Sequence, residues 1–173
     1  PKAFVDQFID AYKDIWKSYG IDYNHFIRTT DTAHVKAVQH WLKDLQDKGD
    51  IYKGSYEGWY CTPCETYLTE KDFEKDTKNP ECPSCQRETT LLSEECYFFK
   101  LSKYQDKLLK FYEDNPHFIT PKERAAEVVS FVKGGLQDLS ISRTGITWGI
   151  PFPGDEKHVT YVWADALNNY ITA

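Results

Sequence analysis

Four cysteines form two pairs of identical spacing near the middle of the sequence. Cys61 and Cys64 make the first C-x2-C pair, and Cys82 and Cys85 make the second after seventeen intervening residues. A C-x2-C pair bends the backbone so that two thiolates point at one centre, and two such pairs complete a tetrahedron of soft ligands that suits Zn²⁺. Because four cysteine ligands leave no coordination position for water or substrate, we expect a structural zinc and not a catalytic one.

Two other uses of these four cysteines stay open at this point, namely iron in the same tetrahedron or disulfide bonds. Disulfides are the less favoured use, because nothing in the sequence marks the chain as secreted and a fifth cysteine, Cys96, would be left over. Cys96 lies in the strand-like run EECYFFK, where we expect a small buried hydrophobic residue and not a fifth ligand. Reduced cysteines of this kind favour a cytoplasmic protein.

The composition is that of a chain with a packed core. Its 173 residues are 40% hydrophobic and 16% aromatic, which suffices for one ordinary domain or two small ones. The net charge is −6 and the basic residues are scattered, so charge alone does not indicate a nucleic-acid surface. No apolar run approaches the ~18 residues of a membrane span, and we expect no membrane partner. Because the chain begins at Pro1 and contains no Met, we expect an excerpt of a longer polypeptide.

Helical patterns precede the cysteines. Apolar residues at helical spacing predict one helix over residues 4–19 with Gly20 as its C-terminal stop, and a second helix from residue 32 to Gly49. The run IYKGSYEGWYC, residues 51–61, is typical of a strand that leads into the first cysteine pair.

Strands and helices also follow the cysteines. Residues 88–101 predict strand structure. Two capping boxes, Ser102 with Gln105 and Thr120 with Glu123, predict two further helices. The chain then has a Pro-rich turn and a final β run that we expect to extend from His158 to Trp163. This order predicts an α/β frame interrupted by an insertion that carries a zinc ribbon.

Several long and unusual stretches occur along the chain: FIRTTD, GDIYKGSYEGWYC, YFFKLSKYQ, GLQDLSISR, WGIPFPGD followed by HVTYVW, and YVWADALNNY. Together they closely resemble the methionyl-tRNA synthetases, a family of class I aminoacyl-tRNA synthetases. The resemblance runs along essentially all of the chain but covers only the middle of that enzyme.

The resemblance implies an α/β fold, with parts of a Rossmann-like class I catalytic domain interrupted by an α+β insertion. Residues 1–49 would end the first half of the catalytic domain, 50–150 would be the connective-peptide insertion with its zinc ribbon at 61–85, and 151–173 would begin the second half. The full-length enzyme would use Mg²⁺ and ATP to activate methionine and would transfer the methionine to tRNA(Met). The two family motifs that grip ATP are missing from the chain, so we expect no catalytic residue in it and no activity from it alone.

The resemblance also implies where methionine binds. In the family, a Trp, an apolar residue four positions further on and a Tyr seven positions further on line the methionine pocket. Their equivalents here are Trp163, Leu167 and Tyr170, with Val162 and Ala166 beside them. Aromatic faces suit a polarisable thioether. From pattern alone, an aromatic strand is more often sheet core, so the pocket assignment depends on the resemblance, and Leu167 fits either interpretation.

Three other residues attract attention without a firm role. Arg143 could contact phosphate or tRNA, or form an ion pair that joins the insertion to the frame. His34 and His158 have no neighbour in sequence that suggests a triad or a metal site, and no role is predicted for them.

Two rival functions fit parts of the sequence. A zinc-ribbon module could bind nucleic acid or protein without catalysis, but it would not need the helices and the α/β frame around the ribbon. Another class I synthetase for an apolar amino acid would carry a larger editing insertion. The sequence makes no prediction of the oligomeric state.

Overall fold

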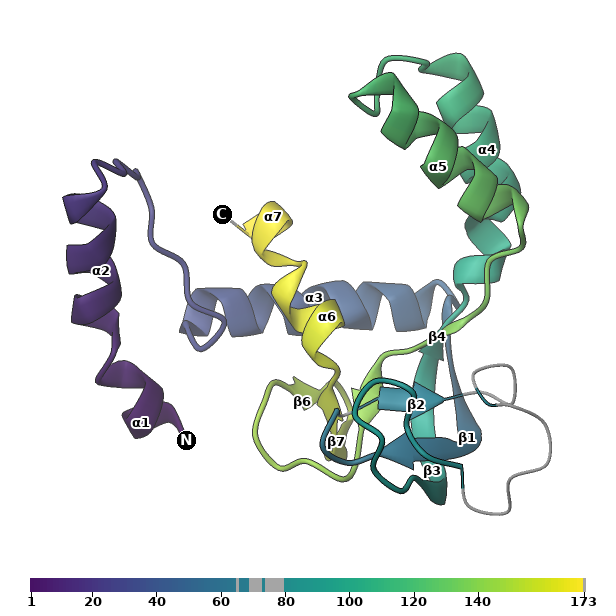
Figure 1. Cartoon of the computed structure of the whole chain (residues 1–173), viewed down its shortest axis with the longest axis horizontal. Helices are drawn as coiled ribbons and strands as arrows, with labels where there is room; N and C mark the ends of the chain where they lie inside the picture. Colours follow the sequence, from purple (N-terminus) through teal and green to yellow (C-terminus); the bar gives the residue numbers. More distant parts are fainter. Residues whose placement is uncertain (65, 69–72, 74–79, 173) are drawn as a thin grey trace. The chain divides into compact units, whose positions relative to one another are not determined.

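The computed structural model describes residues 1–64, 66–68, 73 and 80–172. The chain forms two compact units, of which unit 1 comprises residues 1–49 and 145–173 and unit 2 comprises residues 50–144 (Figure 1). Unit 2 is therefore inserted into the sequence of unit 1. Residues 145–150, which the family resemblance assigned to the insertion, cluster with unit 1.

The first predicted helix of unit 1 is divided in two. α1 (Lys2–Asp6) and α2 (Ile9–Ser18) replace the single helix expected over residues 4–19. The division occurs where the Phe8 N–H bonds to the Val5 carbonyl at 3.2 Å, three residues back instead of four. The expected stop at Gly20 is confirmed. Gly20 has a φ of +68°, which glycine adopts without steric cost.

α3 (Thr32–Asp47) supplies the core of unit 1 and confirms the second predicted helix. Its buried residues recur at helical spacing: His34, Val38, Leu42 and Leu45. The Gln39 amide on this helix donates to the Pro151 carbonyl at 3.1 Å. That contact places the hairpin of β6 (Pro151–Phe152) and β7 (Asp155–Thr160), which pair antiparallel, beside α3.

The expected β run to Trp163 is wrong beyond Thr160. β7 ends there, and two short helices follow, α6 (Val162–Ala166) and α7 (Asn169–Thr172). Tyr161 keeps an extended conformation as the N-cap, and its carbonyl accepts the Asp165 N–H at 3.1 Å. The β-branched residues before Trp163 suggested a strand, but the alanine-rich stretch after it favours a helix.

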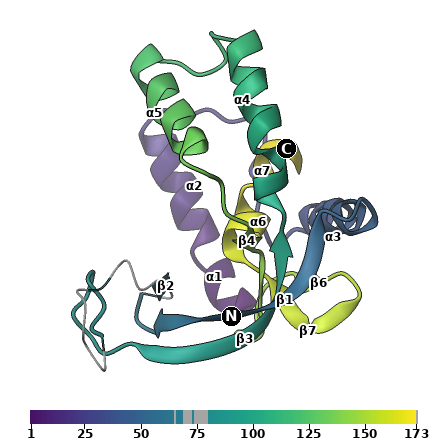
Figure 2. The same cartoon turned by 90° about the vertical axis from the view of Figure 1, so that its right-hand side faces the viewer.

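Unit 2 is built on a long antiparallel ribbon. β1 (Ile51–Cys61) pairs with β3 (Thr90–Phe99) in a register from Ile51 opposite Phe99 to Tyr60 opposite Thr90 (Figure 2). β2 (Thr66–Leu68) pairs with the end of β1, and β4 (Leu139–Ser140) pairs with β3, so the sheet order is β2-β1-β3-β4. A further short strand, β5 (Ser142–Arg143), contacts β3. The strands expected on both sides of the cysteines are confirmed.

Two helices follow the ribbon, as predicted, but the capping boxes do not form. A 3₁₀ turn, η2 (Leu101–Tyr104), leads into α4 (Gln105–Asp114), and α5 (Lys122–Lys133) packs against α4. Neither helix has a side-chain N-cap hydrogen bond. The Ser102 hydroxyl donates instead to the Asp138 carboxylate at 2.6 Å, because tertiary structure offers it a charged acceptor.

A buried carboxylate ties η2 to the start of β1. Asp50, which is 2% exposed, accepts hydrogen bonds from Lys103 Nζ and from the Tyr104 hydroxyl, both at 2.5 Å. The hydrogen bond from Lys103, which has the largest effect, and the one from Tyr104 hold the pKa of Asp50 below its ordinary value. Among the described residues, no helix has the length and apolar character of a membrane span.

Candidate functional site

The four cysteines lie in two turns at one end of the β1–β3 ribbon. Cys61 is the last residue of β1, and Cys64 lies in the turn that follows it. Cys82 and Cys85 share a second turn, which is closed by a hydrogen bond of 2.8 Å from the Gln86 N–H to the Cys82 carbonyl. Gln86 has a φ of +57°, so the chain reverses sharply after this pair. The structure thus brings together all four of the predicted metal ligands.

The sulfur atoms of this cluster have the spacing of a tetrahedral site. All four lie within 4.8 Å of one another. Cys61 Sγ is 3.4 Å from Cys85 Sγ, and Cys82 Sγ is 3.9 Å from Cys64 Sγ. Four ligands at about 2.3 Å from a central Zn²⁺ would be separated by about 3.8 Å along each edge of a tetrahedron. The cysteines are free thiols, and Cys96 lies outside the cluster, buried and opposite Gly54 on β1.

Apolar side chains cover one part of the cluster, in which Cys61 and Cys82 are buried and Cys64 and Cys85 are half-buried. Cys61 and Cys82 are buried together with Leu68, and Trp59 and Phe73 pack against them. Such an apolar shell limits the access of water to a metal bound by these cysteines.

The thiol pKa values show how easily individual cysteines of this cluster ionise. Hydrogen bonding with Cys85, followed by Cys61, raises the pKa of Cys64 to about 12, and burial raises the pKa of Cys61. At Cys82 burial is the largest effect and disfavours the thiolate, but hydrogen bonds from the backbone N–H groups of Cys85 and Ser84, together with those from the Cys61 and Cys85 side chains, lower the pKa to about 7. The thiolate is thus favoured at Cys82 and disfavoured at Cys61 and Cys64, so a cation at the centre of the cluster would be needed to hold these sulfur atoms as thiolates together. The donor set fits a soft divalent metal.

The residues of the predicted methionine pocket lie on α6 and α7 or at their ends. Trp163, Leu167 and Tyr170 have the i, i+4, i+7 spacing of a helix face in sequence, but the structure divides them between α6, its C-cap residue Leu167, and α7. Trp163 is 59% exposed and Tyr170 is 88% exposed, and Leu167 and Val162 are exposed as well. Ala166 is half-buried. These side chains lie on a shared short segment, and most of their surface is uncovered within the chain.

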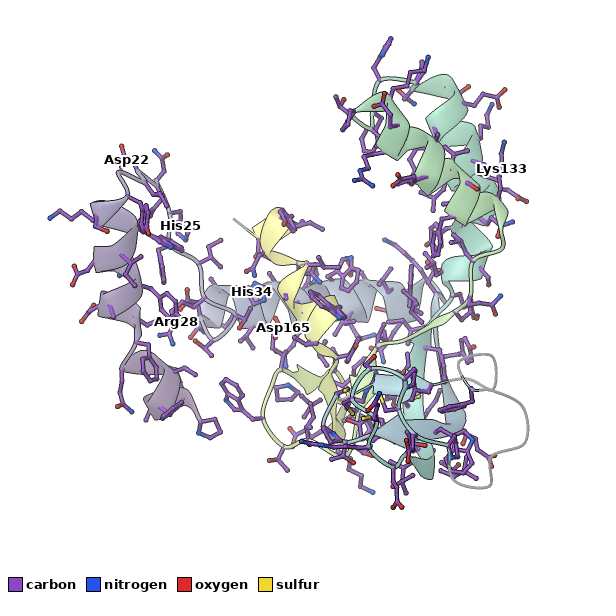
Figure 3. All side chains as sticks on the ribbon, in the orientation of Figure 1. Asp22, His25, Arg28, His34, Lys133 and Asp165 are labelled. Carbon is purple, nitrogen blue, oxygen red and sulfur yellow. The ribbon has the colours of Figure 1, made fainter. Side chains whose placement is uncertain are left out.

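One residue of this region was missed from the sequence. His34 is buried on α3, and its ring joins both short helices, with Nε2 2.7 Å from Asp165 Oδ1 and Nδ1 3.0 Å from Thr172 Oγ1 (Figure 3). Its position one turn before Val38 on the core face was a signal that the imidazole is buried and needs polar partners. The partners themselves lie more than 130 residues further along the chain and could not be identified from local spacing.

The other two residues without a firm role make local contacts. The Arg143 guanidinium donates to the Ser140 hydroxyl and to the Ser142 carbonyl, both at 2.7 Å. His158 is buried, with Nε2 3.7 Å from a carboxylate oxygen of Asp155.

Comparison with known proteins identifies the family. The profile of the family "tRNA synthetases class I (M)" matches residues 1–90 and 71–173, which together cover the chain. The chain belongs to this family of class I synthetases. The resemblance drawn from the sequence motifs is therefore confirmed, as is the expected class I synthetase fold.

Individual members of the family match the whole chain. The methionine–tRNA ligase of Clostridium tetani is 54% identical over 174 residues, which are 100% of this chain and 26% of that protein. The methionine–tRNA ligase of Thermotoga maritima is 47% identical over 173 residues, which are 100% of this chain and 28% of that protein. The chain spans about a quarter of the length of these curated relatives.

A solved structure of the same family has the same fold. It is the Mycobacterium tuberculosis methionyl-tRNA synthetase in complex with methionyl-adenylate, which is 40% identical and superimposes with a TM-score of 0.86. The alignment covers 99% of this chain and 34% of that chain. The free state of the same enzyme superimposes with a TM-score of 0.82.

Proposed function

We propose that this chain is the central part of a methionine–tRNA ligase, whose full-length form activates methionine with ATP and transfers it to tRNA(Met). The observation that carries the proposal is the identity of 54% over the whole chain with a relative of that name. The relative that superimposes on 99% of the chain holds methionyl-adenylate, the activated amino acid of this reaction.

The reaction has two steps. A carboxylate oxygen of methionine attacks the α-phosphorus of ATP, the bond from that phosphorus to the bridging oxygen of the β-phosphate breaks, and pyrophosphate leaves. A terminal ribose hydroxyl of the tRNA then attacks the carbonyl carbon of methionyl-adenylate, and AMP leaves. Mg²⁺, when bound, stabilises the negative charge that develops on the phosphates. The ATP-gripping motifs of the family lie outside this chain, which contributes the amino-acid side of the site.

The division of the chain supports distinct roles for its parts. We assign residues 1–49 to the end of the first catalytic half, 50–150 to the connective-peptide insertion and 151–173 to the start of the second half. The clustering of the N-terminal and C-terminal parts in unit 1, with residues 50–144 inserted between them as unit 2, supports this assignment apart from residues 145–150, which cluster with unit 1. The exposed faces of Trp163, Leu167 and Tyr170 support a place in the methionine pocket, because a ligand can cover them, and Val162 and Ala166 would lie beside that pocket.

The metal of the insertion is assigned as a structural zinc held by Cys61, Cys64, Cys82 and Cys85. Four thiolates close the coordination sphere, so the metal holds the two turns in place and takes no part in acyl transfer. Iron would accept the same four ligands, and metal analysis distinguishes the two. Reduced cysteines favour a cytoplasmic parent enzyme over an exported one.

Methionine-dependent exchange of labelled pyrophosphate into ATP tests the proposed activity. We expect exchange from the parent enzyme with methionine and none with leucine or valine, since the pocket is built for a thioether. We expect exchange at background from residues 1–173 alone, because the ATP-binding groups are outside this segment. Exchange by residues 1–173, or a parent enzyme without methionine-dependent exchange, would contradict the proposal.

A further inference from the structure

His34 joins three helices of unit 1 through its two ring nitrogens. The imidazole belongs to α3 and is 2% exposed, and it contacts Asp165 on α6 at 2.7 Å and Thr172 on α7 at 3.0 Å (Figure 3). An ionised carboxylate only accepts hydrogen bonds, so Nε2 carries a proton and donates it to Asp165. In the neutral ring Nδ1 is then the acceptor of a hydrogen bond from the Thr172 hydroxyl. One side chain therefore binds both short helices.

The two short helices depend on such contacts for their position. α6 has five residues and α7 has four, far below the length at which a helix is stable by itself. Neither helix contributes a buried residue to the core among the residues that the structure describes. Asn168, between them, is 5% exposed, and its amide donates to the Ala164 carbonyl within the same segment. The hydrogen bonds to His34 are thus a main constraint between this segment and α3.

The geometry links these hydrogen bonds to the pocket. Asp165 follows Trp163 by two residues, and Thr172 follows Tyr170 by two residues. Two residues of an α-helix correspond to a rotation of about 200°, so on each helix the residue bound by His34 and the pocket residue lie on nearly opposite sides. This agrees with their burial, because Trp163 and Tyr170 are exposed whereas Asp165 and Thr172 are at least partly covered.

We propose that His34 is a positioning residue of the methionine site, which holds Asp165 and Thr172 on α3 and thereby sets the placement of Trp163 and Tyr170. The inference rests on the proposed function and extends it to a residue outside the pocket. His34 acts through these two helices and does not itself contact methionine. Its loss lets α6 and α7 shift relative to α3 and weakens methionine binding, while the ATP-binding segments elsewhere in the parent enzyme keep their geometry.

The test uses three variants of His34 in the full-length, zinc-containing parent enzyme. His34→Ala removes both hydrogen bonds. His34→Gln retains an amide N–H near the position of Nε2 and can still donate to Asp165. His34→Asn retains an amide near the position of Nδ1 and can still form a hydrogen bond with Thr172. The matched control is His40→Ala, because the His40 side chain lies on the same helix and is 80% exposed.

The expected result is a change in methionine KM that follows the number of hydrogen bonds lost. We expect His34→Ala to raise this KM by about tenfold or more, since small displacements of a positioning group have large effects. His34→Gln and His34→Asn should give smaller increases, and His40→Ala none. The ATP KM should stay within about twofold in every variant. A folded His34→Ala enzyme with a lowered melting temperature but an unchanged methionine KM would overturn the positioning role.

A second pair of variants keeps the test valid if His34→Ala does not fold. Thr172→Val removes the hydroxyl at nearly constant volume, and Thr172→Ser keeps it. We expect a rise in methionine KM of about threefold for Thr172→Val, in line with one hydrogen bond lost, and a nearly normal KM for Thr172→Ser. Equal KM values in this pair would overturn the inference.

Amide hydrogen exchange separates this inference from the proposed function. We expect faster exchange over residues 162–172 in His34→Ala than in wild type or His40→Ala, because opening of α6 and α7 becomes easier. A wild-type parent enzyme without methionine-dependent pyrophosphate exchange would overturn the proposed function. The role of His34 alone would be overturned if the wild type were normally active while the His34 variants kept both the amide hydrogen exchange of residues 162–172 and the methionine KM of wild type.

Discussion

Replacing Trp163 with alanine in the parent enzyme removes the largest side chain of the proposed methionine pocket. A large aromatic side chain can bury roughly 150–250 Å². Trp163 is 59% exposed within the chain, which leaves on the order of 100 Å² for a ligand to cover. If methionine covers about half of that area, the loss at about 25 cal/mol per Å² is about 1.3 kcal/mol.

The contact between sulfur and the indole adds about 0.3–1.5 kcal/mol. The combined loss of about 1.6–2.8 kcal/mol corresponds to a decrease in methionine affinity of about tenfold to a hundredfold. Folding should suffer less than at a typical core position, because more than half of the indole surface is uncovered before the ligand binds. Trp163→Phe keeps a π-face of smaller area and should retain part of the affinity.

Steady-state pyrophosphate exchange with varied methionine and ATP measures both KM values, and thermal melting of the same preparations measures stability. Trp148→Ala is the matched control, because Trp148 also belongs to unit 1 and is 47% exposed. We expect a raised methionine KM for Trp163→Ala and a normal one for Trp148→Ala, with the ATP KM nearly unchanged in both. A methionine KM within about twofold of wild type, together with a lowered melting temperature, would show that Trp163 is a packing residue and refute the pocket.

Three further predictions concern unit 2. Elemental analysis should find one zinc per chain, and Cys96→Ser should retain it, whereas abundant iron or much less than one zinc would refute the assignment. Cys82→Ala in the parent enzyme should release the metal, loosen the two turns and impair aminoacylation, because metal-binding free energy is also folding free energy here. Normal aminoacylation without metal would show that the zinc ribbon is dispensable. Asp50→Asn should lower the melting temperature. Because the Lys103 and Tyr104 hydrogen bonds hold the pKa of Asp50 below its ordinary 3.8, the stability difference between wild type and variant should be fully present above pH 3.8 and should shrink as the pH falls through the lower pKa of the folded state. A stability difference that stays constant down to acid pH would contradict this.

The gathering of four cysteines was predictable because they come in local pairs. Each C-x2-C pair forms its own tight turn, so the residue spacing already determines which sulfur atoms can share a centre. The fifth cysteine, Cys96, could be distinguished from the predicted ligands for the same reason, because it lies in a strand pattern and has no second cysteine at ligand spacing. The structure places Cys96 in β3, apart from the cluster.

The end of the chain shows where local pattern failed. Val159, Thr160 and Val162 have strand-forming side chains, and they suggested one continuous strand through Trp163. The structure turns into a helix after Tyr161, although the segment is too short for intrinsic helix propensity to decide its conformation. The i, i+4, i+7 spacing of Trp163, Leu167 and Tyr170 is itself a helical period and was the signal that favours the observed structure.

The sequence by itself determined the properties that depend on neighbours along the chain: the paired cysteine turns, the core face of the helix from residue 32, the stops at Gly20 and Gly49, and the motifs that resemble one family. Tertiary structure alone decided which distant groups meet. The hydroxyl of Ser102 bonds to Asp138 and not to its own helix, and His34 bonds to Asp165 and Thr172. The physical reason is that a buried polar group must find a hydrogen-bond partner, but which partner lies within reach depends on how the chain folds back on itself.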